Sequence, residues 1–330
     1  MYEKFYGFTS KPFQLKPDPR FFYGSKGHKR AMSYLDYGIS QGEGFIVITG
    51  EIGAGKTTLM RNLFSELDTQ NIVAAQIVNT HVDSEDILRL VAGAFGIDYE
   101  NVSKASMLRR IEQFLRQVDL QGKRALLVVD EAQNLTPRAL EELRMLSNFQ
   151  TDDKCLLQTF LLGQPEFRQI MHSPEMQQLY QRIIANYHLG PLDIIETRDY
   201  IEHRLITVGW KNNPRITREA FMAIHNFTGG IPRKINSFCD RLFLMGYLEE
   251  LREFTAAEIG NVIKDIQQDI NVPRQPVTGK TPQAVDDLSE NYSKSDQLDE
   301  RLNRMERALT TVIDTLNKLM HPTKANSLHD

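Results

Sequence analysis

Cysteine and long hydrophobic runs are scarce in this 330-residue sequence, and each scarcity excludes a class of protein. Cys155 and Cys239 are the only cysteines. They are too few for a disulfide framework and lack the spacing of metal ligands. No stretch approaches the roughly 18–20 uninterrupted apolar residues that span a bilayer, and the first residues lack the basic and then apolar order of a signal peptide. We therefore expect a cytoplasmic protein that is recruited to the inner membrane only through a partner.

A strong charge of either sign is missing as well. The 39 Lys and Arg residues against 43 Asp and Glu residues leave a formal net charge of -4. This balance gives no overall electrostatic reason to bind nucleic acid, although it leaves open a local basic patch such as residues 26–30. With 41% hydrophobic and 25% charged residues the composition is that of a globular protein, and its length predicts about two folded units.

The first 24 residues are dense in aromatic residues and prolines. Pro17 and Pro19 flank Asp18, and this pattern excludes a regular helix there. Because so many rings would not be left in water, we expect an irregular N-terminal arm over residues 1–24, packed on the core. A helix is expected next, near residues 26–40.

Between residues 25 and 192, short apolar runs alternate with segments of helical periodicity. The runs typical of buried strands are 45–49, 72–78, 125–129 and 156–162. The helical segments are 56–67, 84–95, 104–118 and 137–147. This alternation predicts an α/β domain of three layers, in which helices cover both faces of a parallel sheet.

After residue 193 the strand pattern disappears. Residues 193–270 contain four helical segments and predict a small all-α lid domain. Residues 271–296 have the composition of a flexible linker. Residues 297–320 carry a heptad seam that predicts an amphipathic or coiled-coil helix, and the pattern leaves open whether it docks on its own chain or self-associates. The seam consists of Leu298, Leu302, Met305, Leu309, Val312, Leu316 and Leu319. Residues 321–330 are expected to be a disordered tail.

The sequence G-E-I-G-A-G-K-T at residues 50–57 matches the P-loop pattern between a predicted strand and a predicted helix. Its glycines bring backbone N–H groups against phosphates, and the helix N-terminus favours the same anion. We expect Lys56 to reach the terminal phosphates of ATP and Thr57 to coordinate Mg²⁺. The predicted nucleotide-binding residues are Gly50, Glu51, Ile52, Gly53, Ala54, Gly55, Lys56, Thr57 and Thr58.

Two carboxylates follow the apolar run at 125–129. A strand that ends in Asp130 and Glu131 places both side chains at the carboxyl edge of the sheet, beside the P-loop. We expect Asp130 to hold Mg²⁺ together with Thr57, and Glu131 to polarise the attacking water. The sequence therefore predicts an ATP hydrolase.

Five further motifs, together with the P-loop, carry a resemblance to a known family. They are D-E-A-Q-N at 130–134, L-L-G-Q-P-E-F at 161–167, Q-R-I at 181–183, G-G-I-P-R at 229–233 and the arm motif P-D-P-R-F-F at 17–22. The chain resembles the AAA+ ATPases of the general secretion pathway A (ExeA-like) family over roughly residues 1–270. More narrowly, it is similar to the secretion ATPases of PEP-CTERM and exosortase loci, which accompany exopolysaccharide genes.

The resemblance implies roles for four more residues. Gln164 matches sensor 1, which contacts the γ-phosphate or the water, and Arg233 matches sensor 2 on the lid. Arg182 matches the arginine finger that one subunit delivers to the ATP of the next, which implies a homo-oligomer, either a ring or a filament. Asn79 ends the second strand and is our candidate for a switch that holds Glu131 away from the water.

The resemblance leads to three hypotheses about function. The leading one is an AAA+ ATPase that powers or regulates secretion or exopolysaccharide export. The alternative is a DNA-binding ATP switch akin to the transposition ATPases of the Mu type. A third is a nucleotide-dependent scaffold whose heptad segment, 298–319, binds a protein partner. Family members continue through a membrane span into a peptidoglycan-binding domain, whereas a linker and a heptad follow here, so we do not expect direct peptidoglycan binding.

Overall fold

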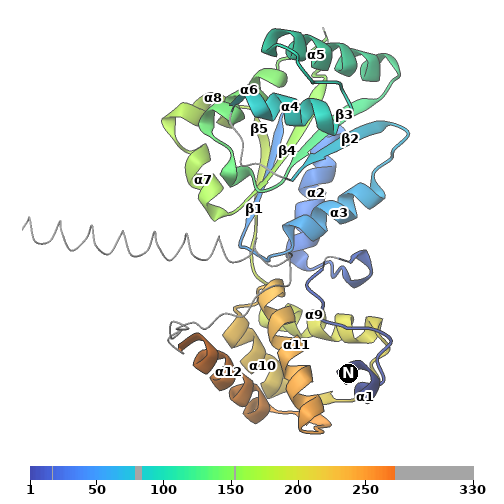
Figure 1. The fold of residues 1–330 in the computed structure, drawn as a ribbon, viewed down its shortest axis with the longest axis vertical. Helices are drawn as coiled ribbons and strands as arrows, with labels where there is room; N and C mark the ends of the chain where they lie inside the picture. The colour runs from blue at the N-terminus through green and yellow to red at the C-terminus, as the bar shows by residue number, and fades with distance from the viewer. Residues whose placement is uncertain (17, 79–83, 152–153, 272–330) are drawn as a thin grey trace, which may run out of the picture. The chain divides into compact units, whose positions relative to one another are not determined.

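The computed structural model describes residues 1–16, 18–78, 84–151 and 154–271 (Figure 1). Four predictions fall wholly or mostly outside these residues: the role of Asn79, the linker at 271–296, the heptad segment at 297–320 and the disordered tail at 321–330. The described helices include none that is both long and apolar enough to cross a membrane.

The α/β part is built on a five-stranded parallel sheet with the strand order β2-β3-β4-β1-β5. Its strands are β1 (Phe45–Gly50), β2 (Ile72–Ile77), β3 (Arg124–Val129), β4 (Leu157–Gly163) and β5 (Ile183–Leu189). Every residue of the central strands β1 and β4 is buried, which explains why they are continuous apolar runs. All four predicted strands are present.

The sequence analysis missed the fifth strand, β5. It lies at the edge of the sheet beside β1, and Asn186 and His188 leave it half exposed. An edge strand needs a buried side chain only at some positions, so its sequence lacks the continuous apolar run that marked the other strands.

Helices cover both faces of the sheet. They are α2 (Lys26–Gln41), α3 (Lys56–Glu66), α4 (Ser84–Ala94), α5 (Lys104–Leu120), α6 (Pro137–Leu146), α7 (Pro165–Met171) and α8 (Gln177–Tyr180), with 3₁₀ turns η2 (Ala132–Asn134) and η3 (Pro174–Met176). Successive residues of β1 point to opposite faces of the sheet. Val47 packs with α4, α5 and α6, whereas Ile48 packs with α2 and α3. The predicted three-layer α/β core is confirmed.

The chain after β5 forms the predicted all-α domain. Its helices are α9 (Ile194–Thr207), α10 (Arg218–Thr228), α11 (Pro232–Leu248) and α12 (Ala256–Asn271), with a short parallel pair, β6 (Arg215–Ile216) and β7 (Glu253–Phe254). Asp193 and Glu196 make a capping box at the start of α9. Gly229 ends α10 in the left-handed conformation, and Pro232 begins α11. These two residues therefore determine where the turn between the helices lies.

The N-terminal arm packs on the helical domain. It contains α1 (Tyr2–Tyr6) and a 3₁₀ turn, η1 (Pro19–Phe21). Its rings join the core of the helical domain and not the sheet: Tyr6, Phe8 and Phe13 all lie 5.4–5.7 Å from the ring of Phe243 in α11. The sheet already has both faces covered, whereas the small helical domain completes its core with the rings of the arm.

Candidate functional site

The turn between β1 and α3 has a backbone that only glycine fits at two positions. Gly53 and Gly55 have φ angles of 84° and 104°. A Cβ atom on Gly53 would lie 2.3 Å from Cβ of Arg233, and one on Gly55 would lie 2.6 Å from Nε2 of His28. The loop is therefore in direct contact with two other elements, and its backbone N–H groups at the start of α3 suit an anion.

Lys56 lies in this turn as a buried cation, with 6% of its surface exposed. Its Nζ donates to the carbonyl oxygens of Gly50 at 2.6 Å and Glu51 at 3.2 Å. Burial lowers the pKa of Lys56, while the nearby carboxylates of Glu131 and Asp130 act in the opposite direction. An ammonium held only by carbonyl oxygens can exchange them for phosphate oxygens, which carry a full charge.

Thr57 and Asp130 bring an oxygen pair to the carboxyl edge of the sheet. Thr57 Oγ1 donates to Asp130 Oδ2 at 3.1 Å, and Asp130 is 2% exposed. Burial raises the pKa of Asp130, and hydrogen bonds from the Glu131 backbone and Thr57 oppose that rise. In the described ranges no three His, Cys, Asp or Glu side chains gather in one place. A cation here would take its other ligands from water and phosphate, which is the coordination that Mg²⁺ prefers, so these residues fit Mg²⁺.

Glu131 follows Asp130 in a left-handed backbone conformation, with φ 53° and ψ 41°. Its Oε2 accepts hydrogen bonds from Gln133 Nε2 at 2.6 Å and from Gln164 Nε2 at 3.0 Å. Burial acts to raise the pKa of Glu131, but these two bonds and the charge of Lys56 outweigh it and lower the pKa. Glu131 is thus an ionised, oriented carboxylate at neutral pH, and its unusual backbone is of the kind found at functional sites.

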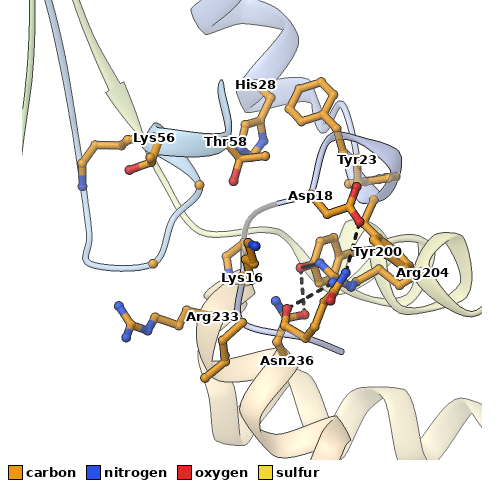
Figure 2. Close-up of a pocket in the computed structure, with 18 of the residues that line it drawn as sticks. Lys16, Asp18, Tyr23, His28, Lys56, Thr58, Tyr200, Arg204, Arg233 and Asn236 are labelled. Carbon is orange, nitrogen blue, oxygen red and sulfur yellow. Dashed lines mark hydrogen bonds between the residues drawn. The ribbon is translucent and has the colours of Figure 1, made fainter. Parts of the chain in front are cut away.

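A pocket of about 320 Å³ opens on this turn. One wall consists of P-loop residues, Glu131 and Arg233, and the facing wall consists of the arm, α2 and the helical domain. Figure 2 shows Lys16, Asp18 and Tyr23 of the arm around the same space as Tyr200, Arg204 and Asn236 of the helical domain. This volume and the mixture of rings and polar groups suit a ligand of nucleotide size.

Arg204 ties the arm to the helical domain at the pocket wall. This buried guanidinium donates to the backbone oxygens of Pro12 at 2.6 Å and Gln14 at 3.3 Å, and to Tyr200 Oη at 3.0 Å. Its Cζ also lies 4.7 Å from the centre of the Phe21 ring, within cation–π distance. Because the arm lacks regular structure over most of its length, these contacts determine where it lies.

His28 connects α2 with the P-loop. It is 6% exposed, and its Nδ1 lies 2.7 Å from Oγ of Ser25, the N-cap of α2. Burial lowers the pKa of His28 to about 4, so the ring is neutral at pH 7. The neutral ring packs against Gly55 and so supports the P-loop, and it adds no charge beside Lys56.

The remaining predicted residues take different places. Arg233 lies in the first turn of α11, lines the pocket and donates its backbone N–H to Gly53 O at 3.2 Å. Gln164 reaches the site by its bond to Glu131. Arg182 does not reach the site. It comes directly before β5, and the first residue of β5 pairs with Phe45. Phe45 begins β1, whereas Gly50, the first P-loop residue, ends it. At about 3.3 Å per residue the two ends lie roughly 20 Å apart.

Arg182 is instead held by the end of α6. Its Nη1 donates to Ser147 Oγ at 2.7 Å, and its Nη2 donates to Asn148 Oδ1. The structure therefore brings the P-loop residues, Asp130, Glu131, Gln164 and Arg233 together at one edge of the sheet and leaves Arg182 at the other.

Several residues of the site were missed by the sequence analysis. The arm residues Gln14, Lys16 and Tyr23 line the pocket, although the sequence indicated only that the arm must pack somewhere. No motif in the sequence marked Arg204 as a site residue, since it lies in an ordinary helical segment. Gln133 belongs to the motif D-E-A-Q-N, but the motif alone did not indicate its function. The structure shows that it donates a hydrogen bond to Glu131.

Comparisons with known proteins identify the family. Residues 39–171 match the family described as an AAA domain. The chain is 40% identical over 248 residues to general secretion pathway protein A of Aeromonas hydrophila, a match that covers 75% of this chain and 45% of that protein. The chain thus spans about half the length of that relative.

Solved structures share the fold at low identity. The ORC2 protein of Aeropyrum pernix has a TM-score of 0.57 and 15% identity, with 78% of this chain and 72% of that chain covered. Cdc6p of Pyrobaculum aerophilum has a TM-score of 0.60 and 16% identity, with 79% and 74% covered. These structures share the fold, and the match to the secretion protein together with the AAA-domain match shows that the chain is an AAA+ ATPase of the general secretion pathway protein A type.

Proposed function

We propose that this chain binds Mg-ATP in the pocket at the carboxyl edge of its sheet and hydrolyses it to ADP and phosphate. The observation that carries the proposal is the hydrogen bond between Thr57 and Asp130, made beside buried Lys56 and ionised Glu131. A structural turn has no need for a cation, a metal-ligand pair and an oriented carboxylate in one place.

Each group has a distinct task in this proposal. The backbone N–H groups of residues 50–57 and the Lys56 ammonium bind the phosphates, and Arg233 reaches them from the helical domain. Thr57 and Asp130 hold Mg²⁺, which neutralises charge on the phosphates when bound. Glu131 takes the proton of the attacking water, and the Gln164 amide faces the γ-phosphate. The arm and Tyr200 enclose the base and exclude water.

Arg182 enters the proposal as a group supplied to a second copy of the chain. Its own site lies roughly 20 Å away along β1 and β5, since a strand rises about 3.3 Å per residue. A head-to-tail contact would instead place one subunit's Arg182 against the neighbour's pocket, and such contacts generate rings or filaments. A guanidinium delivered this way stabilises the charge that develops during phosphoryl transfer.

The cellular task that we propose is to power or regulate a secretion system, in particular one that exports exopolysaccharide. The support is the 40% identity to a protein named for the general secretion pathway and the narrower resemblance to the ATPases of PEP-CTERM loci. The described residues include no membrane-spanning helix, so we propose that a protein partner recruits the chain to the inner membrane.

Phosphate release from ATP tests the activity, with Glu131→Gln as the diagnostic variant and Glu175→Gln, at an exposed position of η3, as the matched control. We expect Mg²⁺-dependent turnover that falls by about 100-fold or more in Glu131→Gln, since a general base contributes roughly 10²–10⁴-fold. Nucleotide binding should persist in that variant. Turnover equal in Glu131→Gln and wild type would contradict the proposal, and turnover that requires duplex DNA would favour the DNA-switch alternative.

A further inference from the structure

Two glutamines beside Glu131 are joined to it and to each other by three hydrogen bonds. Gln133 Nε2 and Gln164 Nε2 donate to the same oxygen of Glu131, at 2.6 Å and 3.0 Å. The backbone N–H of Gln164 donates in turn to Gln133 Oε1 at 3.0 Å. Gln133 thus uses both its donor and its acceptor to join the chain after β3 to the chain after β4. We call Gln133 and Gln164 the amide clamp.

The backbone after β3 explains why Gln133 reaches Glu131. The left-handed conformation of Glu131 turns the chain directly into η2, and the backbone N–H of Asn134 closes this turn on Glu131 O at 3.0 Å. Ala132 is fully buried and anchors the turn. A residue two positions after Glu131 therefore folds back over the Glu131 side chain. Gln133 itself does not line the pocket, so it acts on the site through Glu131.

The clamp changes what Glu131 can do chemically. A carboxylate oxygen that already accepts two amide hydrogens is a weaker base than a free one, because those bonds stabilise its charged form. They also fix the direction in which the carboxylate points. A general base has to present an oxygen to water within hydrogen-bond distance, so a base held by two donors is restrained in both strength and direction.

The Gln164 amide nitrogen carries two N–H groups, and in the structure it donates one of them to Glu131. In the proposed function this amide faces the γ-phosphate, whereas in the structure it donates to Glu131. A γ-phosphate is a stronger acceptor than a carboxylate that is already bonded to Gln133. Its arrival draws the Gln164 amide off Glu131, and ADP, which lacks that phosphate, does not.

We propose that the amide clamp holds Glu131 in a resting orientation and that the γ-phosphate of ATP releases it through Gln164. Gln133 is then a positioning residue that keeps the base at rest until ATP is bound. This inference rests on the proposed function, since it requires ATP in the pocket. It concerns two glutamines on the chain after β3 and β4, whereas Asn79 lies outside the described residues.

Thermal unfolding of Gln133→Leu tests the clamp without turnover. Wild type and variant are compared without nucleotide, with Mg-ADP and with Mg²⁺ plus a non-hydrolysable ATP analogue. We expect the variant's Tm to lie about 3–5 °C lower in the first two states, as the loss of a charged hydrogen bond predicts. With the ATP analogue the gap should close to about 1 °C, because the clamp is then open in both proteins. Gln113→Leu, at an exposed position of α5, is the matched control.

Basal ATP turnover is the second measurement. With Glu131 no longer restrained by Gln133, we expect turnover to rise by roughly threefold or more with KM unchanged. Gln133→Met removes the donor without adding a charge beside Glu131, and should behave like Gln133→Leu if the latter does not fold.

The outcomes separate the inference from the proposed function. An equal Tm gap in all three nucleotide states, or turnover that falls as it does in Glu131→Gln, would show that Gln133 is a structural residue only and would overturn the clamp. A wild-type Tm that neither nucleotide raises would contradict ATP binding itself and the clamp with it.

Discussion

The two walls of the pocket are built in different ways. The P-loop wall is formed mainly by neighbouring residues, 50–58, in the turn between one strand and one helix, and Glu131 and Arg233 complete it. The facing wall joins arm residues near Gln14 to Arg204 and Asn236, which lie about two hundred residues further along the chain. Local backbone geometry determines the first wall, and side-chain contacts between distant segments determine the second.

The two walls differ in function as well as in construction. The wall that carries the phosphate-binding groups is fixed by strand β1 and helix α3, so its geometry survives changes elsewhere. The wall that we propose for the base consists of an arm held chiefly by Arg204 and by rings packed on Phe243. A nucleotide that bridges both walls would therefore link the sheet to the helical domain, which is a route by which ATP binding can reposition that domain.

Removal of the cation from the P-loop wall should have the largest effect. Lys56→Ala deletes the buried ammonium, and charge-assisted hydrogen bonds of about 1.5–3 kcal/mol each predict a loss of ATP affinity on the order of 100-fold. Titration with a fluorescent ATP analogue measures this loss. Lys29→Ala, at an exposed position of α2, is the matched control. Equal affinity in Lys56→Ala and wild type would place the phosphates elsewhere.

Loss of the tie in the facing wall should have a smaller and different effect. Arg204→Met leaves the carbonyl oxygens of Pro12 and Gln14 without their donor. We expect the free energy of unfolding to fall by about 3 kcal/mol and ATP affinity by roughly tenfold, while kcat at saturating ATP is preserved. Denaturant unfolding and steady-state kinetics measure the two effects. Arg198→Met, an exposed residue of the same helix paired with Asp199, is the control. A kcat that fell with affinity would show that the walls do not act separately.

The contact between α2 and the P-loop should give the smallest effect, seen only on acidification. Because the pKa of His28 is about 4 in the fold and near 6.5 in an unfolded chain, the unfolded state binds the proton first as pH falls. This stabilisation is present above about pH 6.5 and is lost as pH falls toward 4, by roughly 2 kcal/mol between pH 7 and 5. His28→Gln should lack this part of the decline, measured by denaturant unfolding at both pH values.

The exposed His172 supplies the control for that experiment. His172→Gln should decline with pH as wild type does. Parallel declines in His28→Gln and wild type would mean that His28 is protonated as easily in the fold as in the unfolded chain, and that the P-loop wall has no pH-sensitive support from α2.

The comparison of the walls also explains what could be predicted from the sequence. The structure brings the P-loop and the pair Asp130 and Glu131 to one sheet edge, because both follow buried strands and parallel strands end together, and the chemical roles given to them stay predictions. Strand β5 was missed because an edge strand with polar positions has no continuous apolar run. The sequence indicated that the arm is packed on the core but not on which part of it, since the aromatic content indicates burial and not the partner that provides it.

Other features depend on geometry that no periodicity reveals. Gln133 bonds to Glu131 only because Glu131 adopts a left-handed backbone, which is uncommon for a residue other than glycine. Arg204 reaches the arm because α9 and residues 12–14 meet in the folded chain. The role predicted for Arg182 stays a prediction that concerns two copies of the chain.

A mixing experiment tests the central claim, ATP hydrolysis at a site completed by a second subunit. Glu131→Gln keeps Arg182 but lacks the base, and Arg182→Ala keeps the base but lacks the guanidinium. Each variant alone should be nearly inactive. An equal mixture should recover roughly a quarter of wild-type turnover, because head-to-tail contacts pair some intact sites with an intact Arg182. A mixture as inactive as its components, or Arg182→Ala as active as wild type, would contradict the account.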